Sequence, residues 1–587
     1  MRDVYYEEEL RYLKEEGARF AEKYPQRAGY LNLESAKDRD PKVEALFEGF
    51  AFISAGIRER IDDALPSLAE GLTGLVWPQF LHPIPAICIT EFKPRPGTLQ
   101  GTCSLRRGTP LFTDPDPATG VSCQFATTQE VRVSPISVWG AQTAASADGK
   151  DALTITFKLD KGIRPEALDL SPVRLFINDE LPAALHIRKM LLCHAEEVIL
   201  SDDAGRSKTL PPQDVFAEGG FGEEDGLFPE PQRAGRALGL IRDCFAFPER
   251  FMFIDLCGLD ALARRGGCAA SSLSLRIRFD RKLSAKVSLS GETFKLHCAP
   301  AVNVFRRDAE PIIVDGRKYE YDLVSDAGRP DCFAIHSVTS VVGIDTATGA
   351  RREYERYCKA GVGRQRFYSL RAEELSGDGH GLLYNNDRRL KLSMNGRQTE
   401  EGRLIRETLH IEAWQTNGAL ARKALTEGGS LHKAAPDFPD YITFANITKP
   451  NPPINPPSGG KYLWTFLSHL ASAYTNFGEA ESLKELLRAY DWGGHAPPRP
   501  EIEAIRSVSV KPIDLSVDKA VIRGAEMNIV VDEQAAPEES LFLLGTVLAR
   551  SLSCMASINT FLKLILTMPV SGKSCEWYCR SGERWAV

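Results

Sequence analysis

The chain has 587 residues, of which 43% are hydrophobic and 26% are charged, so it can bury several cores of about 150 residues each. The net charge of −7 leaves no basic excess to hold a phosphate backbone, which disfavours nucleic-acid binding. Neither a signal-peptide pattern nor a run of about 20 apolar residues occurs, so we expect a cytoplasmic protein without direct membrane insertion.

Residues 1–85 are predicted to form a helical region. The first helix should end at Tyr24 and Pro25, because a proline cannot continue it. A second helix should start at Asp40, a favourable N-cap, with Pro41 at its first position. Its apolar residues recur at steps of three and four and form one stripe, made of Val43, Leu46, Phe47, Phe50, Ile53, Ile57, Ile61 and Leu65.

Phe52 departs from this stripe. At about 100° per residue, its side chain points to the polar side of the helix, near Glu48 and Glu59. An aromatic ring at that position indicates a helix that is covered from two sides, as in a component of an assembly. Phe52 is therefore a candidate partner-interface residue, with burial in the chain's own core as the alternative.

The composition changes at residue 86. Two segments, 86–310 and 311–445, carry runs of β-branched and aromatic residues separated by Gly, Pro and Asp, which predicts strands joined by turns. We interpret both segments as β-rich, sandwich-like units.

A proline-rich stretch follows the second β-rich segment. Five prolines lie between Pro450 and Pro457, which excludes a helix or a central strand there. Segment 446–500 is therefore predicted as a linker followed by a helical hairpin, and segment 501–587 as an α+β region with an apolar helix over 538–566. The predicted fold class is α+β and multidomain, with a helical N-terminal region, two β-rich units and a helical and α+β C-terminal region.

Large side chains in apolar helices and strands are further candidates for contact with other proteins, because aromatic residues concentrate binding energy at interfaces. Core packing is the ordinary alternative for each of them. These candidates are Trp77, Trp464, Leu467, His469 and Phe561.

No constellation typical of an enzyme is found. Asp62 and Asp63 are adjacent on a helix and diverge by about 100°, so they cannot flank one substrate bond. His469 has no second His at a spacing of three or four residues. The 13 cysteines are scattered and contain no C-x-x-C pair. We expect no catalytic residues, no metal and no cofactor.

Several short segments occur in an order that resembles a known protein family. They are Asp40-Pro41, EGFAF at 48–52, Pro83-Ile84-Pro85, FPERF at 247–251, CAPAVNVF at 298–305, Glu310-Pro311-Ile312, Thr416-Asn417 and LWTFLSHL at 463–470. Together they are similar to the TssF family, also called ImpG or VasA, which is a baseplate subunit of the bacterial type VI secretion system. Ala126 and Pro135 stand where the family more often has Arg and Trp-Pro.

The resemblance implies a structural protein of a contractile injection machine with a phage-baseplate-wedge-like fold. Its implied partners are a TssG-like subunit, a second copy of this chain, a TssK-like adaptor, TssE and the sheath, and the VgrG spike. It also implies docking at the inner face of the inner membrane through the membrane complex of the secretion system. The alternatives are a wedge protein of a contractile phage tail or injection particle, and a β-sandwich carbohydrate-active protein.

Overall fold

A computed structural model describes most of the chain as two compact units, one of Met1–Val76 with Ser458–Ser468, and one of Trp77–Pro457 with His469–Val587. The described residues are 2–23, 45–55, 70–74, 77–145, 150–163, 168–228, 236–262, 271–284, 287, 289–357, 366–374, 388–395, 406–456, 478–493, 499–517, 520–556 and 560–581.

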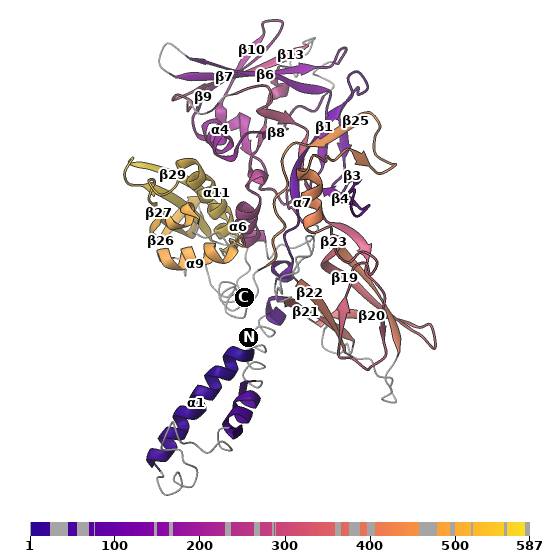
Figure 1. Ribbon diagram of the computed structural model, residues 1–587. Helices are drawn as coiled ribbons and strands as arrows, with labels where there is room; N and C mark the ends of the chain where they lie inside the picture. Colours follow the sequence, from indigo (N-terminus) through magenta and orange to yellow (C-terminus); the bar gives the residue numbers. More distant parts are fainter. Residues whose placement is uncertain are drawn as a thin grey trace. The chain divides into compact units, whose positions relative to one another are not determined.

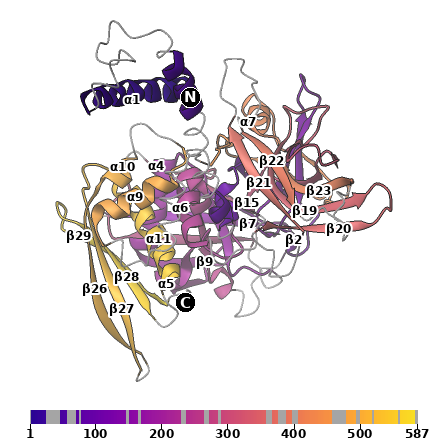
Figure 2. The same ribbon diagram turned by 90° about the horizontal axis from the view of Figure 1, so that it is seen from below.

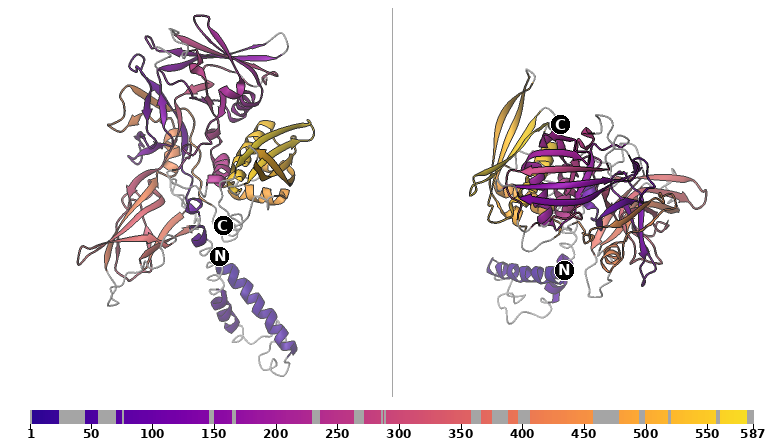
Figure 3. Two further views of the ribbon diagram at one scale, coloured as in Figure 1. Left: turned by 180° about the vertical axis from the view of Figure 1, so that it is seen from behind. Right: turned by 90° about the horizontal axis from the view of Figure 1, so that it is seen from above.

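The first unit is helical where it is described, as the sequence predicts. Helix α1 spans Arg2–Lys23, and the predicted helix end at Tyr24 and Pro25 lies outside the described residues. Residues 45–55 form a second helix, which runs beside α1 in Figures 1 and 3, and residues 70–74 are also helical.

The second unit begins with a six-stranded sheet whose strands come from three distant parts of the chain (Figure 1). Its order is β24 (Lys433–Ala434), β3 (Pro110–Pro115), β4 (Ser122–Thr127), β15 (Cys298–Val302), β1 (Ile87–Pro94) and β25 (Ile442–Asn446). Strands β24 and β25 lie in the segment 311–445 or at its end, yet they pair with strands of the segment 86–310. The two predicted β-rich segments therefore share this sheet.

Two smaller sheets complete the part of the unit between β4 and β15. One has the order β10 (Ser207–Leu210), β9 (Ala195–Asp202), β13 (Ser272–Phe279), β7 (Asp151–Leu159) and β6 (Ile136–Ala145). The other has the order β11 (Phe216–Glu218), β12 (Phe253–Leu256), β8 (Val173–Ile177) and β14 (Phe294–Leu296). The remaining elements here are a pair of strands and short helices: β2 (Cys103–Leu105), β5 (Val131–Val133), α4 (Leu181–Cys193), α5 (Pro212–Val215), η4 (Pro248–Phe251) and η5 (Leu259–Ala261).

An eight-stranded sheet follows in the chain. Its strands are β16 (Phe305–Asp308), β23 (Glu407–Thr416), β19 (Ala334–Asp345), β20 (Arg351–Arg356), β21 (Phe367–Glu374), β22 (Arg388–Asn395) and β18 (Glu320–Leu323), with β17 (Ile312–Val314) also paired to β23. Glu407 is fully buried there, and accepts bonds from Arg352 Nη1 at 3.0 Å and Tyr354 Oη at 2.6 Å. Gly343 leaves the space that this carboxylate occupies, because a Cβ would collide with it.

The C-terminal part is a four-stranded sheet packed against helices (Figure 2). Its elements are α9 (Ala480–Tyr490), α10 (Pro500–Glu503), β26 (Ile505–Val517), β27 (Ala520–Val531), α11 (Glu538–Met555), β28 (Phe561–Met568) and β29 (Lys573–Ser581). Helix α6 (Arg236–Ala246) packs against α11 and α9, whereas α7 (Ala419–Thr426) packs against β3 and β4 of the six-stranded sheet. The short helix η2 (Pro78–Leu81) precedes β1. Helix α11 connects the parallel strands β27 and β28. The predicted apolar helix over 538–566 is therefore too long: its last residues form β28, where burial alternates from Leu562 to Met568 as in a strand.

Two buried asparagines join the six-stranded and eight-stranded sheets. Asn303 lies between β15 and β16, Asn417 follows β23, and both are almost fully buried. Asn303 Nδ2 donates to Asn417 Oδ1 at 2.9 Å, and the backbone N–H of Asn417 donates to Asn303 Oδ1 at 2.7 Å. Asn417 also accepts from the backbone N–H of Gln124 on β4 and donates to the carbonyl of Cys332.

We predict that Asn417→Ala destabilises the protein by about 2–3 kcal/mol, because it leaves buried donors and an acceptor without partners. Urea denaturation, followed through the unfolding transition of the second unit, measures this change in the free energy of unfolding. Asn395→Ala is the control, because Asn395 is an exposed residue of β22, and it should change the free energy of unfolding by less than about 0.5 kcal/mol. Equal effects of the two substitutions would contradict the role given to Asn417.

Candidate functional site

The helix of residues 45–55 exposes its apolar stripe. The side chains of Leu46, Phe50 and Ile53 are each 60% exposed, whereas Ala51 and Ala55 are fully buried. Within the described part of the predicted stripe, Phe47 is half-buried, and the small residues Ala51 and Ala55 face the interior of the unit. The remaining stripe residues lie outside the described residues: Val43, Ile57, Ile61 and Leu65. Phe52 is 55% exposed as well. Exposed large apolar side chains in one helix are typical of a surface that contacts another protein.

Trp77 is placed in the core of the second unit, 7% exposed. Its ring lies 5.4 Å from that of Phe80, which in turn contacts Tyr490 at 5.5 Å. The guanidinium of Arg242 lies 5.4 Å from the Phe80 ring. Phe80 therefore packs η2 against α9 and α6, and the ring of Trp77 is buried beside it.

Phe561 is also a core residue, 3% exposed at the start of β28. It pairs with Gly524 of β27, and its ring fills the space in which a Cβ of residue 524 would lie. The chain itself buries the rings of both Trp77 and Phe561. The other candidates, Trp464, Leu467 and His469, lie outside the described residues.

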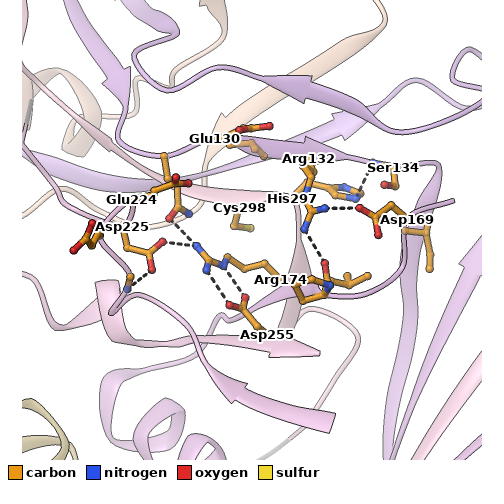
Figure 4. Close-up of a pocket in the computed structure, with 17 residues that line it drawn as sticks. Glu130, Arg132, Ser134, Asp169, Arg174, Glu224, Asp225, Asp255, His297 and Cys298 are labelled. Carbon is orange, nitrogen blue, oxygen red and sulfur yellow. Dashed lines mark hydrogen bonds and ion pairs between the residues drawn. The ribbon is translucent and has the colours of Figure 1, made fainter. Parts of the chain in front are cut away.

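A polar pocket of about 580 Å³ lies among β5, β8 and β12 and the loop at 222–225 (Figure 4). Its central residue is Arg174 on β8, which points between two carboxylates. Nε and Nη2 of Arg174 donate to Asp255 at 2.7 and 2.9 Å, and Nη1 donates to Asp225 at 2.6 Å and to Gln129 at 2.9 Å. The guanidinium therefore fastens three segments that are distant in sequence.

The charges of Arg174 and Asp225 set each other's protonation state. Burial alone would raise the pKa of Asp225, but the charge of Arg174 and its hydrogen bond outweigh burial and lower that pKa. Burial likewise acts against the charged form of Arg174, while Asp255 and Asp225 together raise its pKa far above the usual value. Both groups stay ionised at neutral pH.

The remaining pocket residues do not form a nucleophile and base. His297 Nε2 accepts from the backbone N–H of Ser134 at 3.2 Å, and burial lowers the pKa of His297 to about 4. The Cys298 thiol donates to the carbonyl of Leu296, and burial raises its pKa. A neutral, hydrogen-bonded imidazole and a protonated thiol serve packing here. Within the described ranges, no group of three or more His, Cys, Asp or Glu side chains is arranged to hold a metal ion.

Sequence reasoning missed this pocket, because Arg174, Asp225 and Asp255 lie in three separate segments without a shared motif. Among the residues with described structure, no helix has the length and apolar character needed to span a membrane.

Comparison with known proteins identifies relatives over the whole length. The family model described as "Type VI secretion system, TssF" matches residues 3–584. The type VI secretion system component TssF1 of Pseudomonas aeruginosa strain PAO1 is 28% identical, with 99% of this chain and 98% of the relative covered.

Two solved structures are similar to the chain. One chain of a cryo-electron microscopy structure of the type VI secretion TssK-TssF-TssG baseplate subcomplex matches with a TM-score of 0.75 and 26% identity, covering 92% of this chain and 99% of that one. One chain of the baseplate complex from the type VI secretion system matches in fold with a TM-score of 0.61 at 24% identity, covering 100% of both chains.

Several β-rich sheets and a helical N-terminal unit with exposed large apolar side chains are typical of a component of a larger assembly. The match to the family model over residues 3–584 identifies the family within this class. The chain belongs to the TssF family of the type VI secretion system.

We predict that Arg174→Met destabilises the protein by about 3 kcal/mol at pH 7, because Asp225 and Asp255 lose their shared cation. Arg132→Met is the matched control. Arg132 pairs with Asp169 across the same pocket, but both side chains are about half exposed, so the cost should stay below about 1 kcal/mol.

The ion pair of Arg174 and Asp225 also predicts how the destabilisation by Arg174→Met depends on pH. The folded-state pKa of Asp225 is lowered, so its contribution is present above the unfolded pKa of about 4 and is lost as pH falls through the folded value. The gap in free energy of unfolding between the wild-type protein and Arg174→Met should therefore be largest near pH 7 and shrink below about pH 4. A gap that does not change between pH 7 and pH 3 would exclude this role of Arg174.

Proposed function

We propose that this protein is a structural, non-enzymatic subunit of a type VI secretion baseplate, where it forms a wedge with a TssG-like subunit and a TssK-like adaptor. The observation that carries the proposal is the likeness to the TssF-containing baseplate subcomplex, at a TM-score of 0.75 over 99% of that chain. The phage-tail and carbohydrate alternatives receive no comparable support.

The wedge proposal extends to a second copy of the chain, to the VgrG spike that such wedges surround, and to TssE and the sheath that polymerises from them. We place the protein in the cytoplasm, docked at the inner face of the inner membrane through the membrane complex. Support comes from the family match and from the sequence resemblance alone.

Co-expression with the neighbouring genes of its secretion cluster tests the main proposal. We expect this chain to co-purify with a smaller TssG-like protein and to remain bound through size-exclusion chromatography. A chain that purifies as a stable monomer in the presence of both partner proteins would contradict the proposal.

We further propose that the helix of residues 45–55 contacts a partner helix in the wedge. Phe50, Phe52 and Ile53 supply large apolar side chains on a surface of about half of the helix circumference, with the buried Ala51 and Ala55 on the remaining side. Burying such side chains removes apolar surface from water and stabilises a complex by about 1.5–3 kcal/mol for each fully buried ring or aliphatic chain.

Phe52→Ala tests the contact. We expect at least a tenfold loss of affinity for the co-expressed partner, typical of a hot-spot aromatic, with an unchanged thermal unfolding midpoint of the free chain. Glu48→Ala is the control on the same helix, because Glu48 is exposed and charged, and it should change affinity by less than about twofold. If Phe52→Ala lowers the unfolding midpoint and leaves binding intact, Phe52 is a core residue instead.

A further inference from the structure

The five-stranded sheet of β10, β9, β13, β7 and β6 has one buried face and one open face. On β7, Ile155 and Phe157 are buried, whereas Thr156 and Lys158 point to the other side of the strand and are half-buried and exposed. Burial alternates in the same way along β13. The sheet lies at the top of Figure 1, with α4 below it. We name the outward side chains of β6, β7, β13 and β9 the open face.

A β-bulge places a tryptophan on the open face. The pairing of β6 with β7 shifts register between Val138 and Gly140, and Trp139 is the extra residue of the bulge. Its side chain is 68% exposed, and Nζ of Lys158 lies 4.1 Å from the centroid of its ring. The contact with Lys158 holds the ring on this face. An exposed tryptophan in a fixed position is typical of the residues that anchor an interface.

Small hydroxyl side chains form a flat row beside this tryptophan. Thr156 of β7 pairs with Ser274 of β13, which pairs with Ser201 of β9. Oγ1 of Thr156 and Oγ of Ser274 are 3.5 Å apart, and Oγ of Ser201 donates to the carbonyl of Ser274 at 3.4 Å. Side chains of this size let the backbone of another chain come close to the sheet, and their oxygens accept hydrogen bonds from it.

Two cations lie on opposite sides of the hydroxyl row. Lys158 follows Thr156 by two residues on β7, and Arg276 follows Ser274 by two residues on β13, which runs antiparallel to β7. Both side chains are exposed. Within the described part of the chain, neither of them forms an ion pair, and Lys158 instead contacts the Trp139 ring.

The carboxylates at the borders of the open face have other partners. Glu196 and Glu197 of β9 each lie 3.4 Å from the guanidinium of Arg278, at the end of the sheet far from Lys158. Asp203, directly after β9, accepts from the backbone N–H of Ser271 at 2.8 Å and from its hydroxyl at 2.5 Å. The centre of the open face is therefore positive, although the whole chain has a net charge of −7.

We propose that the open face docks an acidic segment of another baseplate subunit, which packs an apolar side chain on Trp139 and binds Lys158 and Arg276 through carboxylates. The inference rests on the proposed function and adds the chemistry of one partner surface. Carboxylates complement the two cations, and such complementarity gives an interface its specificity and its rate of association. A nucleic acid fits less well, because the net charge of −7 repels a phosphate backbone.

Photocrosslinking in the bacterium that makes the protein tests the docking surface. The photoreactive p-benzoylphenylalanine replaces Gln142 of the full-length chain, because Gln142 is exposed and pairs with Thr154 on the open face. Mass spectrometry should map the crosslink to a segment rich in Asp and Glu in another subunit of the secretion system.

The crosslinking result separates this inference from the proposed function. If the chain co-purifies with the TssG-like subunit but gives no crosslink, or crosslinks to a neutral or basic segment or to nucleic acid, the docking surface is wrong and the proposed function stands. If the chain co-purifies with no subunit of the secretion system, the proposed function is contradicted and the inference falls with it.

Substitutions on the open face identify the side chains that bind. Trp139→Ala should lower the crosslink yield at least about tenfold, as for an anchor aromatic, and leave the unfolding midpoint unchanged because the ring is mostly exposed. Lys158→Glu should also lower the yield, because it replaces an attraction with a repulsion. Lys511→Glu is the matched control, since Lys511 is an exposed residue of β26 in another sheet, and it should change the yield by less than about twofold.

Charge reversal on the partner completes the test. Replacing the carboxylates of the crosslinked segment with lysine should restore the crosslink yield of the chain that carries Lys158→Glu. Equal yields for the wild-type protein, Lys158→Glu and Lys511→Glu would overturn the proposal. The charge variants decide the outcome if Trp139→Ala lowers the unfolding midpoint.

Discussion

The reciprocal amide bonds between Asn303 and Asn417 are the constraint on which the second unit depends. Each asparagine lies at a point where the chain passes between the six-stranded sheet and its surroundings, and each satisfies the backbone of a different segment. A buried amide holds neighbours at fixed angles, because its donors and acceptor have set directions. Apolar contacts alone would allow the two sheets to slide. The two sheets are therefore oriented by hydrogen bonds.

Arginine has a similar role at several other junctions. Arg174 joins β8 to β12 and to the loop at 222–225, Arg242 lies against Phe80 and Asp243, and Arg352 binds the buried Glu407. The planar guanidinium can meet a carboxylate and an aromatic face at the same time, which lysine cannot do. Such contacts hold together segments that are distant in sequence.

Local sequence patterns predicted which segments form helices and strands, but they did not predict which strands pair with one another. The helical pattern of the first residues corresponds to α1, and the strand and turn signals after residue 86 correspond to real strands. The return of β25 to β1 could not be predicted, because pairing depends on tertiary packing rather than on local preference. The spacing of Leu46, Phe50 and Ile53 correctly predicted that these residues share one face of a helix. The helical period alone does not determine whether such a face packs against the chain itself or against another protein. The sequence left Trp77 and Phe561 open in the same way, and the structure buries both side chains within the chain.

The pairing of β1 with β25 has a consequence for synthesis of the protein. The backbone N–H of Ile89 is bonded to Thr448, 359 residues further along the chain. On the ribosome, β1 therefore leaves the exit tunnel long before its neighbour exists, with an unpaired hydrophobic edge. Closing such a long loop is slow, and exposed strand edges invite association with other chains. The central sheet can close only when about three quarters of the protein has been made, and until then this edge of β1 has no strand to pair with.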